Sequence, residues 1–159
     1  MGHIRIDRLD PDSAPWADIM ALIRRSFAYM DGVIDPPSSA HRLTVEELKR
    51  KARREIALAA YDDGRLAGCV FIELRSDHAY IGKLAIDPAQ QRGGLGRLLV
   101  EAAEAQAKKV GLAALELQTR IELTLNQAMF RHLGFRETAR TAHPGFDRPT
   151  AVTMRKDLR

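Results

Sequence analysis

Three glycines stand within four residues of one another, at Gly93, Gly94 and Gly96. They lie in the segment from Leu84 to Arg97, which has the pattern of a strand, a turn and the start of a helix. The first N–H groups of a helix have no backbone partner, and the helix dipole places partial positive charge there. Glycines let a bulky anion approach the main chain, and Arg92 and Arg97 would add full charges. The segment therefore predicts a phosphate-binding site.

Alternative roles for these three glycines fit the sequence less well. Glycines can simply relieve backbone strain at a tight strand-to-helix turn, but three of them in four residues favour an anion site. A Walker loop ends in Gly-Lys-Ser or Gly-Lys-Thr, which this segment lacks. A Rossmann fingerprint follows its strand directly, whereas here a loop from Asp87 to Gly93 intervenes and an antiparallel meander precedes it. Both of these phosphate motifs are therefore disfavoured.

The elements that must position this turn are predicted from periodicity and from capping residues. Thr44 with Glu47, and Thr124 with Gln127, form two capping boxes that open helices. The strand, helix and strand around the glycine turn imply a right-handed parallel crossover. We expect strands at 4–9, 55–61, 65–74, 79–86, 112–119, 135–142 and 150–157. We expect helices at 14–28, 44–54, from the glycine turn to 110 and at 124–133, and an ordered loop without regular structure at 29–42.

The composition is that of one globular domain. The chain has 159 residues, 45% of them apolar and 29% charged, so we expect a single domain over 1–159. No apolar run is long enough for a membrane span and the N-terminal residues lack a signal-peptide pattern, so we expect a cytoplasmic protein without a membrane partner. Cys69, the only cysteine, is expected to fill the core rather than to form a disulfide, and no metal site is expected.

The formal net charge of +4 does not single out a nucleic-acid partner. Lys and Arg residues are interleaved with Asp and Glu residues, and no aromatic and basic patch or recognition helix accompanies them. A small polyanionic ligand explains the excess equally well. The basic cluster at 49–54 lies on a predicted helix beside Glu46, Glu47 and Glu55, which favours a solvated helix face. We therefore expect no nucleic-acid partner.

The glycine segment also resembles the pyrophosphate loop of the GNAT superfamily of N-acetyltransferases. That loop has the pattern Gln/Arg-x-x-Gly-x-Gly/Ala, which is met here by Gln91-Arg92-Gly93-Gly94-Leu95-Gly96, after a strand that reads Leu84-Ala85-Ile86-Asp87-Pro88. A later pattern resembles the family's helix after the fifth strand: Asn126-x-x-x-Phe130-x-x-Leu133-Gly134-Phe135. The order of elements agrees as well, so the resemblance covers nearly the whole chain.

The resemblance implies an α/β fold of the α+β type, with a central mixed, mostly antiparallel, splayed sheet of about seven strands and about four flanking helices. It implies that acetyl-CoA enters between the strands at 79–86 and 112–119. Main-chain groups of Leu84 and Ile86 would pair with the pantetheine amides, and an N–H near Ile86 would polarise the thioester carbonyl. Backbone N–H groups from 92 to 97 would hold the pyrophosphate. The expected cofactor contacts are Leu84, Ala85, Ile86, Gln91, Arg92, Gly93, Gly94, Leu95, Gly96, Arg97, Asn126 and Phe130.

Many members of the family carry a proton-donating tyrosine where this chain has Phe130. The acid is then supplied by another group or by water, or it is not needed because a thiolate leaves readily. The alternatives are an active enzyme that acetylates a primary amine of a small molecule or peptide, and an acyl-CoA-binding protein with little or no turnover. Glu116 is the preferred general base because its strand would border the thioester, ahead of Glu73, His78 and Tyr80. Each of these is also explained as an ordinary solvated or packed strand residue.

The acceptor side of the site is predicted from one side chain and one loop. The resemblance implies that Asn126 hydrogen-bonds near the thiol end of the cofactor; the alternative is an exposed helical amide. In the family the loop between the first two helices walls the acceptor site, and here Asp31 or Asp35 would attract a cationic amine. The expected acceptor contacts are Tyr29, Asp31, Ser38 and Ser39, although a surface turn explains them equally well. Many relatives dimerise, so a homodimer is expected.

Overall fold

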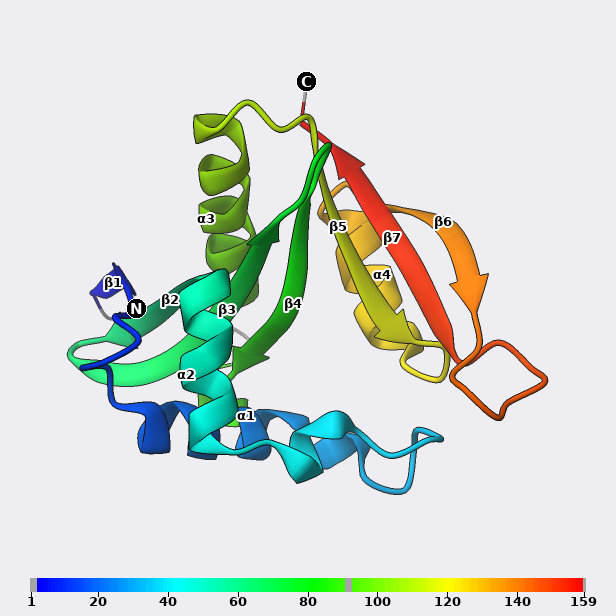
Figure 1. Cartoon of the computed structure of the whole chain (residues 1–159), viewed down its shortest axis with the longest axis horizontal. Coiled ribbons are helices and arrows are strands. Elements are labelled where there is room, and N and C mark those ends of the chain that lie inside the picture. Colours follow the sequence, from blue (N-terminus) through cyan, green and yellow to red (C-terminus); the bar gives the residue numbers. More distant parts are fainter. Residues whose placement is uncertain (1–2, 91–92, 159) are drawn as a thin grey trace.

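The computed structural model describes residues 3–90 and 93–158, which form a seven-stranded sheet with helices on both faces (Figure 1). The strands are β1 (Ile4–Arg8), β2 (Ile56–Asp62), β3 (Arg65–Leu74), β4 (Ala79–Ile86), β5 (Ala114–Arg120), β6 (Arg136–Thr141) and β7 (Ala151–Asp157). Their order is β1-β2-β3-β4-β5-β7-β6, and β4 pairs with β5 in parallel whereas the other described neighbours are antiparallel. The expected mixed, mostly antiparallel sheet is confirmed.

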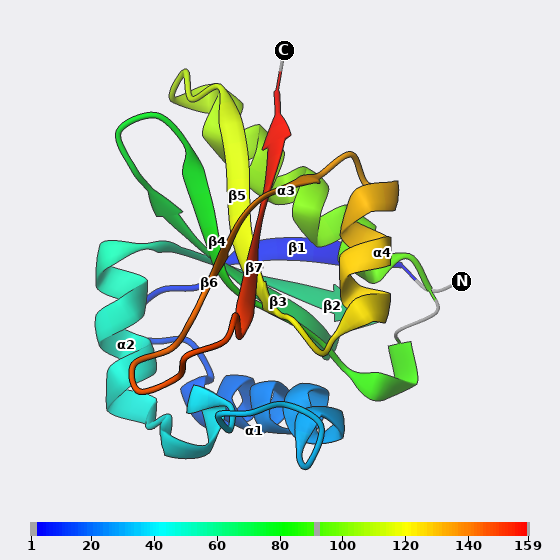
Figure 2. The same ribbon diagram turned by 90° about the vertical axis from the view of Figure 1, so that its right-hand side faces the viewer.

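The four described α-helices cover the two faces of the sheet (Figure 2). The helices α1 (Trp16–Phe27) and α2 (Val45–Arg54) lie on one face, and α3 (Leu95–Lys109) and α4 (Thr124–His132) lie on the other. None of these described helices has both the length and the apolar character needed to cross a membrane.

The segment at 29–42 is more regular than its turn-forming residues predict. Two short 3-10 helices, η1 (Ala28–Met30) and η2 (Ser39–Arg42), lie in or next to it. Ser38 caps η2, because its Oγ accepts a hydrogen bond from the Ala40 N–H at 3.1 Å. The expectation of a loop without regular structure is therefore wrong, and the serine that suggested a turn acts as a helix cap.

One of the two predicted capping boxes forms. Thr44 Oγ1 accepts the Glu47 N–H at 3.2 Å at the start of α2, as expected. At α4 the capping residue is Leu123, which makes no side-chain hydrogen bond to the helix, so the second predicted box is wrong. The Gln127 side chain instead donates to the Arg120 carbonyl oxygen at 3.1 Å, which ties α4 to the end of β5.

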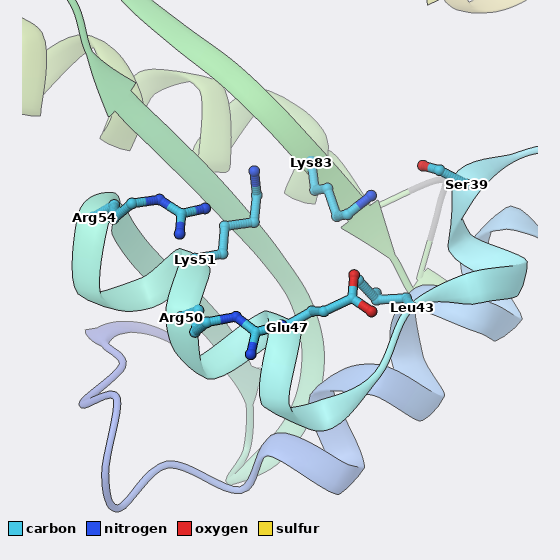
Figure 3. A pocket seen from close by; sticks show the side chains of 7 residues that line it. All are labelled: Ser39, Leu43, Glu47, Arg50, Lys51, Arg54 and Lys83. Carbon is cyan, nitrogen blue, oxygen red and sulfur yellow. The ribbon is translucent and has the colours of Figure 1, made fainter.

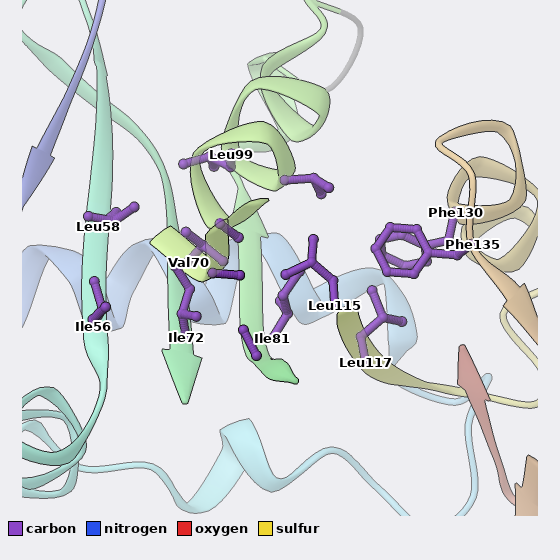
Figure 4. Packing of buried hydrophobic residues seen from close by; sticks show 14 of the residues in the cluster. Ile56, Leu58, Val70, Ile72, Ile81, Leu99, Leu115, Leu117, Phe130 and Phe135 are labelled. Atoms are coloured by element: carbon purple, nitrogen blue, oxygen red, sulfur yellow. The ribbon is translucent and has the colours of Figure 1, made fainter. Parts of the chain in front are cut away.

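A buried apolar cluster joins α3 and α4 to the sheet (Figure 4). Leu99 of α3, Ile81 of β4, Leu115 of β5 and Phe130 of α4 all belong to it. Each large side chain buried in this way contributes about 1.5–3 kcal/mol. Because the cluster includes residues from both β4 and β5, it holds these two strands in fixed positions on either side of the opening described next.

The strands β4 and β5 pair at one end only and then diverge (Figure 1). Their pairing covers Ala79–Ile81 against Leu115–Leu117 and does not extend to the rest of β4. The register of β4 against β3 also shifts at this point, because Ile81 pairs with Ile72 but Lys83 pairs with Phe71, so Gly82 is a bulge residue. The result is a V-shaped opening with its closed end at Gly82, which confirms the expected splayed sheet.

Candidate functional site

The glycine turn lies at the open end of the V, where α3 begins. Gly94 caps α3 in the left-handed region, at φ 76° and ψ 11°, which favours glycine. The first hydrogen bond into the helix runs from the Leu98 N–H to the Gly94 carbonyl oxygen at 3.2 Å, so the preceding N–H groups point out of the helix end. A Cβ built at Gly94 or Gly96 would meet no described atom within 4 Å. The turn therefore presents main-chain donors to open space.

Asp87 holds the start of this turn. Its N–H donates to the Ala67 carbonyl oxygen of β3 at 2.8 Å, and its Oδ1 accepts the Ala89 N–H at 3.0 Å. Arg25 of α1 donates to Asp87 Oδ2 at 3.1 Å. The Ala89 hydrogen bond, followed by Arg25, lowers the pKa of Asp87 below its ordinary value. Of the predicted loop contacts, Gln91 and Arg92 lie outside the described residues.

The free edge of β4 lines the V with main-chain groups. Since the Asp87 N–H turns toward β3 and alternate residues of a strand face opposite sides, Leu84 and Ile86 direct their main-chain groups into the opening. The Ile86 N–H already donates to Ser26 Oγ at 3.1 Å, so it is not available to polarise a thioester as expected. Ala85 turns its main chain toward β3 and its side chain is fully buried. The Leu84 N–H is thus better placed than the Ile86 N–H to donate a hydrogen bond into the opening.

Glu116 lies at the closed end of the V. It pairs with Tyr80 of β4, and its Oε2 accepts a hydrogen bond from Arg155 Nη1 of β7 at 3.1 Å. His78 Nε2 lies 3.9 Å from Glu116 Oε1, and His78 Nδ1 contacts Asp77 at 2.6 Å. The Glu116 side chain is 20% exposed. A half-buried carboxylate held by one arginine, with a second oxygen near an imidazole, can accept a proton.

Glu73 and Tyr80, the two remaining candidates for the general base, have different surroundings. Glu73 forms an ion pair with Arg75 at 2.6 Å, and that hydrogen bond lowers the pKa of Glu73. The Arg75 guanidinium also lies over the Tyr80 ring, 4.1 Å from its centroid, and burial raises the pKa of the Tyr80 hydroxyl. Both groups thus contact Arg75, whereas Glu116 lies on β5, in the stretch that pairs with β4.

Asn126 and Tyr29 meet across the open end of the V. Asn126 Nδ2 of α4 donates to Tyr29 Oη, beside α1, at 2.9 Å. This contact joins a residue predicted to bind cofactor to one predicted to bind acceptor. The other predicted acceptor residues are divided between two pockets. Asp31 and Ser38 line one of about 220 Å³ within the loop, and Ser39 lines another of about 340 Å³ beside α2.

Charged side chains, including two at and just after the end of β5, hold the loop at 29–42 in place, and the sequence pattern did not point to them. Arg120 Nη1 donates to the Pro36 carbonyl oxygen at 2.6 Å. Glu122 Oε2 accepts the Asp35 N–H at 3.3 Å, and Arg148 pairs with the Asp35 carboxylate at 3.1 Å. Asp35, expected to attract an amine, is thus already paired. The only indication in the sequence was a cluster of charged residues at the end of a predicted strand. Such a cluster does not show which residues they contact.

Phe130 belongs to the core rather than to the surface of the opening. Its ring is 7% exposed and packs edge to face on Phe135, with centroids 5.7 Å apart and planes at 68°. Such a pair contributes about 0.5–1.5 kcal/mol beyond its area burial. Phe130 therefore has a packing role, and its side chain carries no hydroxyl that could donate a proton.

The arrangement is a helix start with outward-pointing N–H groups at the open end of two splayed strands. A sequence model of the acetyltransferase (GNAT) family matches residues 16–135, which is most of the chain. The chain belongs to this family. The prediction of a GNAT member is confirmed, and with it the class of enzyme, an acetyl-CoA-dependent N-acetyltransferase.

Individual GNAT relatives resemble the chain to different extents. The IAA acetyltransferase of Azospirillum brasilense is 29% identical over 142 residues, which cover 88% of this chain and 90% of that protein. The ribosomal protein bS18-alanine N-acetyltransferase of Escherichia coli K12 is 34% identical over 95 residues, covering 58% and 64%. The PaiA N-acetyltransferase of Thermoplasma acidophilum, solved with coenzyme A, shares the fold with a TM-score of 0.81 and 19% identity, over 98% of this chain and 99% of that one.

Proposed function

We propose that the chain transfers the acetyl group of acetyl-CoA to a primary amine of a small molecule or peptide by direct attack. The observation that carries this proposal is the pairing of β4 and β5 at one end only, with the glycine turn at the open end. A molecule with a diphosphate at one end and a thioester at the other end of a narrow arm fits this arrangement.

The direction of the cofactor follows from the position of the turn. The diphosphate accepts hydrogen bonds from the N–H groups of Leu95, Gly96 and Arg97 at the start of α3. The pantetheine arm runs along the free edge of β4, where it can pair with the main chain of Leu84. The thioester then lies toward Gly82, at the closed end of the V, and next to the strand that carries Glu116.

Glu116 acts as the general base in the proposed reaction. It accepts a proton from the acceptor ammonium, directly or through a water, so that a neutral amine attacks the thioester carbonyl carbon. The new C–N bond forms as the C–S bond breaks, the nitrogen loses its remaining extra proton to water, and the coenzyme leaves as a thiolate. Phe130 cannot protonate this thiolate, so the proton comes from water, or the thiolate leaves as such.

Two of the relatives are named N-acetyltransferases, which supports an amine acceptor and leaves its identity open. One of them acts on an alanine of a ribosomal protein, which is a peptide substrate. The alternative for this chain, an acyl-CoA-binding protein with little turnover, is favoured by Phe130 alone. Because Phe130 has a packing role against Phe135, we favour the enzyme.

Two measurements separate these possibilities. Calorimetric titration with acetyl-CoA tests cofactor binding, which both alternatives require. Release of free coenzyme A thiol in the presence of a panel of primary amines tests turnover, which only the enzyme requires. Binding with amine-dependent thiol release supports the proposal, binding without release from any amine supports the second alternative, and no binding rejects both.

A further inference from the structure

A pocket lined mainly by cations lies between α2 and β4 (Figure 3). Its volume is about 340 Å³, and it is lined by Ser39, Leu43, Glu47, Arg50, Lys51, Arg54 and Lys83. Figure 3 shows the basic side chains of α2 on one side and Lys83 of β4 on the other, with Ser39 of η2 nearby. Four of the seven lining residues are cations and one is an anion, so the pocket attracts negative charge.

Most of this positive charge has no carboxylate partner within the protein. Lys51 pairs with Glu55 at 2.8 Å. For Arg50, Arg54 and Lys83 no carboxylate lies within 4.0 Å among residues 3–90 and 93–158. Burial, and next the neighbouring charge of Lys51, lower the pKa of the Lys83 ammonium. An anionic ligand would supply the missing counter-charge. It would thereby offset the cost of burying the Lys83 ammonium and the repulsion between Lys83 and Lys51.

The pocket borders the closed end of the V. Lys83 directly follows the bulge residue Gly82, and Lys51 Nζ lies 3.1 Å from where a Cβ of Gly82 would be. Leu115 and Leu117 are buried on the α3 face, so Glu116 between them points to the opposite face, the one that α2 covers. Lys83 pairs with Phe71, which is buried against α1 and α2, so its side chain lies on that face as well. The basic pocket and Glu116 therefore share the face from which an acceptor can approach.

Only some of the basic residues of α2 line the pocket. Lys49 pairs with Glu46 at 3.7 Å and Arg53 pairs with Asp12 at 2.5 Å, and neither of them lines the pocket. Arg50 and Arg54, one helical turn apart, are exposed and line the pocket. The expectation of a solvated helix face therefore fits Arg50 and Arg54 as well, and their place at the pocket adds to it.

We propose that this pocket binds an anionic group, a carboxylate or a phosphate, on the acceptor, so that the acceptor is a primary amine that also carries negative charge. The proposal rests on the proposed function, since it names the class of substrate for that site. The anion contacts Lys83, Arg50 and Arg54, while the amine lies toward Gly82 and the thioester. Ser39, an expected acceptor contact, supplies a hydroxyl at the same pocket.

The first test compares amines that differ only in charge. Amino carboxylates of increasing length from glycine to 6-aminohexanoate, their neutral carboxamides and the aminoalkyl phosphates are each supplied with acetyl-CoA, and thiol release is followed. We expect kcat/KM of at least one acid or phosphate to exceed that of its neutral counterpart about tenfold or more. Which acid is preferred distinguishes a carboxylate from a phosphate. Turnover of the neutral amines with equal or higher kcat/KM would overturn the proposal.

The second test measures anion binding directly and does not depend on turnover. The backbone amide signals of Gly82 and Lys83 are followed by NMR during titration with glutarate and with inorganic phosphate. We expect saturable shifts for at least one anion, weakened about tenfold or more in Lys83→Met and in the double variant Arg50→Gln/Arg54→Gln. Absence of saturable shifts, or shifts unchanged in both of these variants, would overturn the proposal.

The controls are Lys49→Gln and Arg53→Gln, which remove one positive charge each from residues of the same helix that do not line the pocket. Both should keep wild-type anion binding, whereas loss of binding in them equal to that in Lys83→Met would show a general charge effect and reject the pocket. Titration of every variant with acetyl-CoA separates the two proposals. A wild-type protein that fails to bind acetyl-CoA contradicts the proposed function, and normal acetyl-CoA binding without anion binding contradicts only the pocket.

Discussion

The side chain of Asn126 donates a hydrogen bond from Nδ2 to the Tyr29 hydroxyl at 2.9 Å, between segments separated by 97 positions in the chain. Asn126 belongs to α4 on one side of the open V, and Tyr29 belongs to η1 on the other. Tyr29 is exposed and Asn126 is partly exposed, so the bond joins the two sides at the surface rather than in the core. It places the segment that follows α1 beside α4.

Removal of the Tyr29 hydroxyl should affect binding of the acceptor more than the stability of the fold. Because the bond is exposed to water, Tyr29→Phe should lower the free energy of unfolding by about 1 kcal/mol or less, and Asn126→Ala by a similar amount. The double variant should lose little more than either single variant, since both remove the same bond. Urea unfolding checks the stabilities. Strictly additive losses would show that the two side chains do not interact.

Replacement of Glu116 should slow the reaction without weakening cofactor binding. We expect Glu116→Gln to lower kcat about 100-fold or more, as removal of a general base does, with acetyl-CoA affinity unchanged. The matched control is Glu104→Gln. Glu104 also pairs with a cation, Lys156 at 3.2 Å, and is similarly buried, but it lies on α3. Equal loss of kcat in both variants would indicate that only the ion pair matters.

The carboxylate of Asp87 should make the glycine turn sensitive to acid. Its hydrogen bonds to Ala89 and Arg25 lower its pKa in the folded protein, so its contribution is fully present above the ordinary aspartate range of about pH 4. That contribution is lost as the pH falls through the lowered pKa. The wild type should therefore exceed Asp87→Asn in unfolding free energy by about 1 kcal/mol at neutral pH. A difference that grows on acidification would contradict this assignment.

The lone cysteine of the native protein should not react in assays that detect free thiols. Burial raises the pKa of the Cys69 thiol to about 12, and the side chain is fully buried in the core against α1. We expect the native protein to give almost no reaction with a thiol reagent at about pH 8, and one thiol per chain after unfolding. Rapid reaction of the native protein would mean that this core opens readily.

The order and type of the elements could be predicted from the sequence because they depend on local patterns. Asp62-Asp63-Gly64 gives the hairpin between β2 and β3, with Asp63 and Gly64 at positive φ, and Gly111 ends α3 at φ 80°. The divergence of β4 and β5 was expected from the resemblance to GNAT proteins and not from a local pattern. The second capping box failed because Gln127 turns its side chain back to the carbonyl groups at the end of β5 instead of to the helix start.

The details of the site depend on contacts between distant residues, which periodicity does not report. Ser26 satisfies the Ile86 N–H across 60 positions, and Arg148 pairs with Asp35 across 113 positions. Which of the α2 cations line the pocket likewise depends on where β4 places Lys83. The sequence could therefore identify the phosphate turn, which is local, but not the partners of the acceptor residues.

Blocking the turn at Gly94 should abolish cofactor binding in a folded protein. Gly94→Trp fills the open space above the turn and costs about 1–2 kcal/mol of backbone strain, because φ is positive there. Gly111→Trp is the matched control. It has the same strain at φ 80°, also faces open space, and lies at the opposite end of α3. Acetyl-CoA should bind to the control and not to Gly94→Trp, whereas equal binding would place the diphosphate elsewhere.

The most direct measurement is the affinity for acetyl-CoA of a pair of variants at Gly96, which lies in the first turn of α3 and where a Cβ would meet no described atom within 4 Å. Gly96→Gln and Gly96→Glu add nearly the same bulk, and the added carboxylate should stabilise the helix start while it repels a diphosphate. By calorimetry we expect the wild type to bind acetyl-CoA, and Gly96→Glu to bind about tenfold or more weakly than Gly96→Gln. Equal affinities in the two variants, or a wild type that does not bind, would contradict a diphosphate at the start of α3.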